Sequence, residues 1–97
     1  MDYKIFWTEE AIRNLEEIID YLSNTWSERE VIRFKEKLGR IVIHIRSNPL
    51  MFPRSEFQPR LRKAVLSKQV SVFYEIREQF VYLVYIFVNY KSTRKLK

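Results

Sequence analysis

The chain has few of the residues on which metal, redox and nucleotide sites depend. Its 97 residues include no cysteine, one histidine (His44) and one glycine (Gly39). Without cysteine there can be no disulfide and no thiolate metal ligand, and a single histidine makes a zinc cage unexpected. Gly39 stands alone inside a predicted helix, so there is no glycine-rich loop to cradle a phosphate. We therefore expect no metal and no cofactor.

Long apolar segments are also missing. The longest apolar run is Phe80–Val88, which is too short to cross a bilayer as a helix. The first residues show no basic leader followed by an apolar stretch, so no secretory signal is predicted. Apolar residues nonetheless make up 46% of the chain. The sequence therefore predicts one globular domain over residues 1–97, with no membrane association and a cytoplasmic location.

Acidic residues are scarce in the second half of the chain. Residues 1–48 hold eight Lys or Arg and nine Asp or Glu, a net charge of −1. Residues 49–97 hold ten Lys or Arg and three Asp or Glu, a net charge of +7. This asymmetry favours a polyanionic partner, namely nucleic acid, the ribosome or an acidic protein segment. A basic surface that serves only solubility is the alternative.

Two amphipathic helices are predicted after a short β-prone run at residues 3–7. Apolar residues at helical spacing predict the first helix from about Glu9 to Asn24. Ser27 and Glu30 form a capping box that starts the second helix, which Asn48-Pro49 should end. Because the connection between them is short, the two helices form an αα-hairpin.

Three short strands then form a meander after a proline-bearing loop at residues 49–59, which we expect to be ordered and packed on the core. With turns centred on Ser67-Lys68 and Glu78-Gln79, Val65 faces Val70 and Ile76 faces Val81. The predicted fold is therefore α+β: an N-terminal strand, an αα-hairpin and a three-stranded antiparallel meander, with the helices packed on one face of the sheet.

This register assigns each meander residue to a face. The helix-facing set is predicted to be Leu61, Val65, Val70, Val72, Tyr74, Ile76, Val81, Leu83, Tyr85 and Phe87. The residues predicted to contact a partner or phosphate on the open face are Arg60, Arg62, Arg77, Phe80, Tyr82, Val84 and Ile86. Glu75 is the one carboxylate expected on that face, and a salt bridge to Arg60 across the strands accounts for it.

Catalytic candidates are restricted to basic residues and one tyrosine. Arg62 and Lys63 open the meander, while Tyr90 and Lys91 follow it, so these four could contact phosphate or assist proton transfer. None of them ordinarily titrates near pH 7, and the one histidine is predicted to lie outside the meander. The sequence therefore favours binding over catalysis, and metal-independent cleavage of RNA stays the enzymatic alternative.

Several motifs of this chain resemble the RelE/ParE superfamily of toxins from bacterial type II toxin–antitoxin (plasmid stabilisation) systems. The resemblance covers nearly the whole chain. The stretches that carry it are Trp7-Thr8-Glu9-Glu10-Ala11, Asn48-Pro49, Arg62-Lys63-Ala64-Val65, Ser67-Lys68-Gln69 with Phe73-Tyr74, and Asn89-Tyr90 with Lys95-Leu96. The Arg-Lys-Ala-Val and Ser-Lys-Gln stretches are the most specific. Tyr90 departs from the pattern, since close relatives often carry arginine after the asparagine.

The resemblance implies a growth-inhibiting toxin with one of two targets. RelE-like members cleave mRNA on the ribosome, and ParE-like members poison DNA gyrase without cleaving nucleic acid. Both kinds are neutralised by an antitoxin whose extended, often acidic segment wraps the toxin. We favour a ParE-like inhibitor, with a RelE-like ribosome-dependent mRNA endonuclease and a basic binding module without toxin activity as alternatives. A homodimer and a hetero-oligomer with the antitoxin are both compatible with the sequence.

Overall fold

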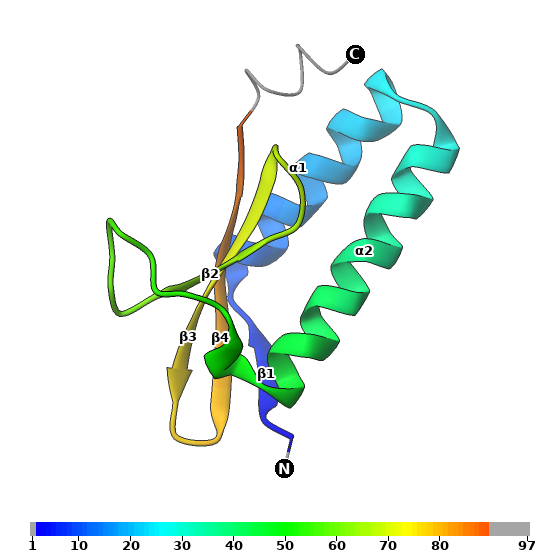
Figure 1. The fold of residues 1–97 in the computed structure, drawn as a ribbon. Coiled ribbons are helices and arrows are strands. Elements are labelled where there is room, and N and C mark those ends of the chain that lie inside the picture. Colours follow the sequence, from blue (N-terminus) through cyan, green and yellow to red (C-terminus); the bar gives the residue numbers. More distant parts are fainter. Residues whose placement is uncertain (1, 90–97) are drawn as a thin grey trace.

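A four-stranded sheet carries two helices on one of its faces (Figure 1). The computed structural model describes residues 2–89. In chain order the elements are β1 (Lys4–Trp7), α1 (Glu9–Thr25), α2 (Glu28–Ser47), the 3-10 turn η1 (Pro49–Met51), β2 (Arg62–Val65), β3 (Val70–Arg77) and β4 (Phe80–Val88). The predicted α+β fold is confirmed, and α1 ends one residue beyond the prediction.

Both helix starts follow from local hydrogen bonding. Thr8 Oγ1 accepts from the Ala11 N–H at 3.1 Å and so caps α1. At α2, Ser27 Oγ accepts from the Glu30 N–H at 3.3 Å, and Glu30 Oε1 accepts from the Ser27 N–H at 3.2 Å. This reciprocal capping box was predicted, and it satisfies N–H groups that have no partner within the helix.

The N-terminal strand completes the sheet from the far edge. The strand order is β1-β4-β3-β2, and β1 runs parallel to β4, with Lys4 opposite Phe80 and Trp7 opposite Leu83. The sheet is therefore mixed, because the meander itself is antiparallel. β1 therefore covers one edge of β4, which is the longest apolar run of the chain.

The predicted register between β2 and β3 is wrong by one residue. Val65 pairs with Ser71 instead of facing Val70. The cause is the turn, where Ser67 Oγ accepts from the N–H groups of Gln69 and Val70 at 3.3 and 3.2 Å. Such a side-chain-capped turn accommodates one more residue than a two-residue hairpin. A slip of one residue moves every β2 side chain to the other face.

The predicted register between β3 and β4 holds only near their turn. Ile76 pairs with Val81 as predicted, but the register shifts between Phe73 and Tyr74. Phe73 pairs with Tyr85, and Tyr74 pairs with Leu83. The extra residue on β4 is Val84, so a β-bulge interrupts the strand there.

The bulge is stabilised by two side chains from the start of the helical hairpin. Thr8 Oγ1 donates to the Val84 carbonyl at 2.8 Å, and Asn14 Oδ1 accepts from the Ile86 N–H at 3.0 Å. Beyond the bulge the side chains of β4 lie on the faces opposite to those predicted. Phe87, predicted to face the helices, is 54% exposed, and Ile86, predicted to lie on the open face, is buried in the core.

The core lies between the sheet and the helical hairpin. Its fully buried side chains are Tyr74, Ile45, Leu61, Leu83, Val72, Val81 and Pro49. The loop after α2 joins this core through Pro49 and through Phe52, which packs edge-on against Tyr74 at 6.3 Å between ring centroids. The prediction of a packed loop is thus confirmed there but is wrong for Leu50, Met51 and Phe57, which are exposed. No helix within residues 2–89 is long and apolar enough to cross a membrane.

Candidate functional site on the open face of the sheet

Arg62 does not lie on the open face. It pairs with the helix-facing Tyr74, and its Nη1 donates to the Phe52 carbonyl at 2.6 Å and to the Leu50 carbonyl at 3.4 Å. The one-residue register slip is the reason for this correction. In this position Arg62 holds the loop after α2 against β2.

Tyr74 supports the same loop from inside the core. Its hydroxyl donates to the Pro49 carbonyl, and its side chain is fully buried. Burial raises the pKa of Tyr74 to about 12, and the nearby Arg62 guanidinium opposes that shift. A buried hydroxyl with a raised pKa stays protonated at neutral pH. Tyr74 and Arg62 therefore form a structural cluster that fixes η1 and the residues after it.

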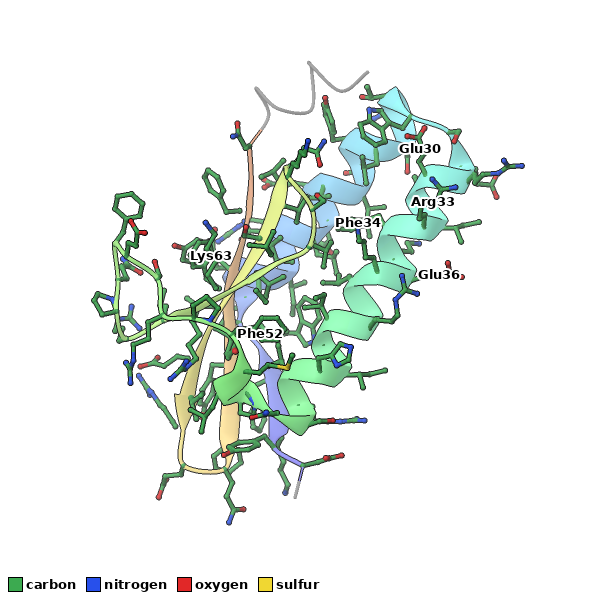
Figure 2. The ribbon with its side chains drawn as sticks, in the orientation of Figure 1. Glu30, Arg33, Phe34, Glu36, Phe52 and Lys63 are labelled. Carbon is green, nitrogen blue, oxygen red and sulfur yellow. The ribbon has the colours of Figure 1, made fainter. Side chains whose placement is uncertain are left out.

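Lys63 takes the place on the open face that Arg62 was predicted to fill. It pairs with Phe73, and its ammonium lies 5.9 Å from the centre of the Phe73 ring. Phe73 stacks in turn on Tyr85 at 4.6 Å between centroids. A cation over an aromatic face is attracted by the ring's electrons. Figure 2 shows Lys63 on the side of the sheet away from the helices.

A groove separates this part of the open face from the loop that precedes β2. We call it the loop groove, and its cavity volume is about 660 Å³. It is lined by Pro53, Arg54, Ser55, Glu56, Phe57, Gln58, Lys63, Val65, Phe73, Tyr85 and Phe87. Val65, Phe87 and Phe57 are all more than half exposed. The loop groove therefore combines exposed apolar surface with cationic side chains, which suits an acidic and apolar partner.

The other end of the open face carries a second group of rings, which we call the aromatic cluster. It consists of Phe6, Phe80, Tyr82 and Arg77. The Phe6 ring lies 5.5 Å from Tyr82 and 5.4 Å from Phe80, and the Arg77 guanidinium lies 5.6 Å from the Tyr82 ring centre. The sequence predicted three of these residues. Phe6 was missed because the parallel pairing of β1 with β4 could not be anticipated.

Ion pairs fix the cations at this end. Glu75 Oε1 lies 3.2 Å from Arg60 Nη1 and 3.5 Å from Arg77 Nη2, so the predicted pair of Arg60 with Glu75 is confirmed. Both arginines are well exposed while the Glu75 carboxylate is mostly covered. Exposed ion pairs add little stability. Their effect here is to orient two guanidinium groups on the open face.

The remaining predicted site residues lie elsewhere. Ile86 is buried in the core, and Val84 lies at the β-bulge with its carbonyl bonded to Thr8. Tyr90 and Lys91 fall outside the described residues. The open face within residues 2–89 is thus built from Lys63, Arg60 and Arg77 together with exposed rings.

The described part of the open face presents charged and aromatic side chains to solvent. The cations of the open face are divided between the loop groove and the aromatic cluster, and its one carboxylate, Glu75, is engaged by two guanidinium groups. General acid–base catalysis needs a group placed near the reacting proton and titrating near the working pH. His44 lies on α2, away from the open face. Within residues 2–89 there is also no group of three or more His, Cys, Asp or Glu side chains arranged to hold a metal.

A smaller apolar pocket lies between the helical hairpin and the turn that joins β2 to β3. Its volume is about 150 Å³. Apolar side chains from both helices and from the strand ends line it, among them Phe34, and Glu30, Arg33 and Lys37 lie at its edge. Figure 2 shows Glu30, Arg33 and Phe34 along the N-terminal half of α2.

The sequence model of one protein family matches nearly the whole described chain. The family is described as the ParE toxin of the type II toxin–antitoxin system, parDE, and the match spans residues 5–88. It therefore includes both helices, the strands β2 to β4, and β1 from its second residue onward. No protein of curated function matches the sequence.

Solved structures of toxin–antitoxin systems share the fold. A chain of the chromosomal ParDE system from P. aeruginosa has a TM-score of 0.76 at 15% identity and covers 89% of this chain and 95% of that chain. A chain of the RelBE2 complex from Mycobacterium tuberculosis has a TM-score of 0.63 at 14% identity, covering 92% and 100%. One from the E. coli DinJ–YafQ complex has a TM-score of 0.64 at 9% identity, covering 94% and 97%.

At these identities the structural matches show a common fold, and the match to the family sequence model carries the assignment. The resemblance noted in the sequence agrees with both. The chain belongs to the ParE toxin family of the RelE/ParE superfamily, and it is a toxin of a type II toxin–antitoxin system.

Proposed function

We propose that this toxin inhibits DNA gyrase without cleaving nucleic acid. The observation that carries the proposal is the match of the parDE toxin family over residues 5–88. The geometry supports it, because Arg62 is engaged with loop carbonyls and the described open-face cations are spread over two separate places. A binding surface of this kind can hold a partner, whereas cleavage of RNA would require groups that converge on one phosphate.

The antitoxin is the second proposed partner. An extended segment with acidic and apolar side chains would find complementary groups along the open face. Arg60 and Arg77 offer guanidinium groups, and Phe80 and Tyr82 offer ring surface. The loop groove continues this surface toward β2. We place the toxin and its antitoxin in the cytoplasm, as a homodimer or a hetero-oligomer, and assign the module to plasmid stabilisation.

The test is a comparison of two readouts after induction in bacterial cells. Gyrase inhibition predicts growth arrest with loss of negative supercoiling in a reporter plasmid, and transcript 5′ ends that do not change. A ribosome-dependent endonuclease predicts the reverse, with new codon-linked 5′ ends and normal supercoiling. In that case Lys63, Tyr90 and Lys91 become the candidates to mutate. Normal growth on induction would instead identify a binding module without toxin activity.

A further inference from the structure

Phe57 is exposed to a degree that the fold does not explain. It is the most exposed large apolar side chain within residues 2–89, at 93%, and the next is Leu50 at 61%. Single exposed apolar residues are common on protein surfaces. Phe57 differs because it borders a groove in which Val65 and Phe87 are also exposed. Contiguous apolar surface of this kind marks a site of interaction.

The loop that carries Phe57 is held in place by hydrogen bonds. The Ser55 N–H donates to the Leu61 carbonyl and the Leu61 N–H donates to the Gln58 carbonyl, both at 2.8 Å. Arg54 Nη1 donates to the Pro59 carbonyl at 2.9 Å. Ser55 and Leu61 are both buried. The ring is therefore presented by a pre-organised loop, which lowers the entropy lost when a partner orders it.

We propose that Phe57 is the anchor by which this toxin docks on its target, inserting into an apolar pocket of a folded protein whose rim carries carboxylates. The inference rests on the proposed function, since it concerns the target of the toxin. The rim of the loop groove has a net positive charge, with Arg54 and Lys63 on it against one acid, Glu56. This charge selects an acidic partner surface. Figure 1 shows the loop projecting away from the helices, where a large partner has free access.

The shape of the site favours a folded target over the other protein occupants. An extended antitoxin segment can fill the groove, but it has no concave pocket to receive a projecting ring. A second copy of the chain offers the apolar pocket beside α2. That pocket carries Arg33 and Lys37 against one acid, Glu30, at its edge, so its net positive charge does not complement the basic rim around Phe57.

The experiment compares Phe57→Ala with Phe57→Trp and with a matched control, Ile43→Ala. Ile43 is an exposed apolar residue on α2, at 52%. The full-length proteins are made by cell-free synthesis and titrated against purified bacterial DNA gyrase. Loss of a central aromatic anchor should raise the half-inhibitory concentration about 30-fold. Phe57→Trp and Ile43→Ala should stay close to wild type, and all variants should keep their melting temperature because both sites are exposed.

Two further measurements identify the occupant. Phe57→Ala should lose far less affinity for the protein encoded by the adjacent gene than for gyrase, and its sedimentation should not change. Unchanged inhibition by Phe57→Ala would overturn the inference and leave the proposed function intact. Loss of antitoxin binding or of self-association in parallel with inhibition would overturn it too, by assigning Phe57 to the wrong partner.

A wild-type protein that leaves gyrase unaffected would refute the proposed function separately. The inference is then decided by growth arrest in cells. Arrest that is lost in Phe57→Ala and kept in Ile43→Ala would support Phe57 as the anchor for a different target. Arrest that persists in Phe57→Ala would overturn the inference.

Discussion

Replacing Arg62 with alanine distinguishes a structural arginine from a catalytic one. Its guanidinium donates to the Phe52 carbonyl at 2.6 Å in a partly buried position. A hydrogen bond from a charged group contributes about 1.5 to 3 kcal/mol. For a domain of this size, each kcal/mol lowers the melting temperature by about 4 to 8 °C. We therefore expect Arg62→Ala to melt about 6 to 24 °C below wild type.

The adjacent Lys63 provides the matched control. It carries the same charge and is exposed, and its ammonium lies over the Phe73 ring. Lys63→Ala should therefore change the free energy of unfolding by less than about 1 kcal/mol. Thermal unfolding by circular dichroism measures both variants. Arg62→Ala should also retain its inhibitory activity per folded molecule at a temperature at which it remains folded. Equal stability of the two variants, or a folded Arg62→Ala without activity, would refute the structural role.

Two further predictions concern the loop anchor and the second helix. Tyr74→Phe leaves the Pro49 carbonyl without its donor and should lower the free energy of unfolding by about 1 to 2 kcal/mol in urea titrations near pH 8. Burial raises the pKa of Tyr74 to about 12, above its ordinary value of about 10, so this residue's contribution is complete below pH 10 and is lost as the pH rises towards 12. The difference between wild type and Tyr74→Phe should therefore shrink from about pH 10 upwards, and a difference that grows would contradict the assignment. Ser27→Ala removes the cap of α2 and should cost about 1 kcal/mol, whereas Ser47→Ala at the exposed end of α2 should cost little.

The parts of the fold that depend on neighbouring residues could be predicted from the sequence. Thr8 starts α1 and Ser27 starts α2, because each cap is a contact between residues three positions apart. The order of elements and the pairing of Ile76 with Val81 were also predicted correctly. These features need no knowledge of the rest of the molecule.

The assignment of residues to sheet faces failed wherever a distant or unrecognised contact decided the register. The Ser67 side chain shifts β2 by one residue, and this moves Arg62 off the open face and Lys63 onto it. Thr8 and Asn14 stabilise the bulge at Val84 across more than 70 positions of sequence. Because the side-chain alternation of a strand has a period of two, each of these events reverses every side chain beyond it.

The candidate site was predicted in part for the same reason. Arg77, Phe80 and Tyr82 follow from the strand pattern near the β3–β4 turn, where the register holds. Arg60 lies before β2, and its predicted ion pair with Glu75 is present although the predicted β2–β3 register is not. Phe6 joins them only through the parallel pairing of β1 with β4. Phe57 was expected to pack on the core, since a proline-bearing loop with apolar residues usually buries them.

The most direct test of the central proposal is the supercoiling of relaxed plasmid by purified bacterial gyrase in the presence of the full-length toxin. We predict inhibition that increases with toxin concentration, accompanied by trapped gyrase–DNA cleavage complexes, and restored supercoiling when the protein encoded by the adjacent gene is added in equimolar amount. Supercoiling that proceeds at its normal rate at a large molar excess of folded toxin would contradict the account.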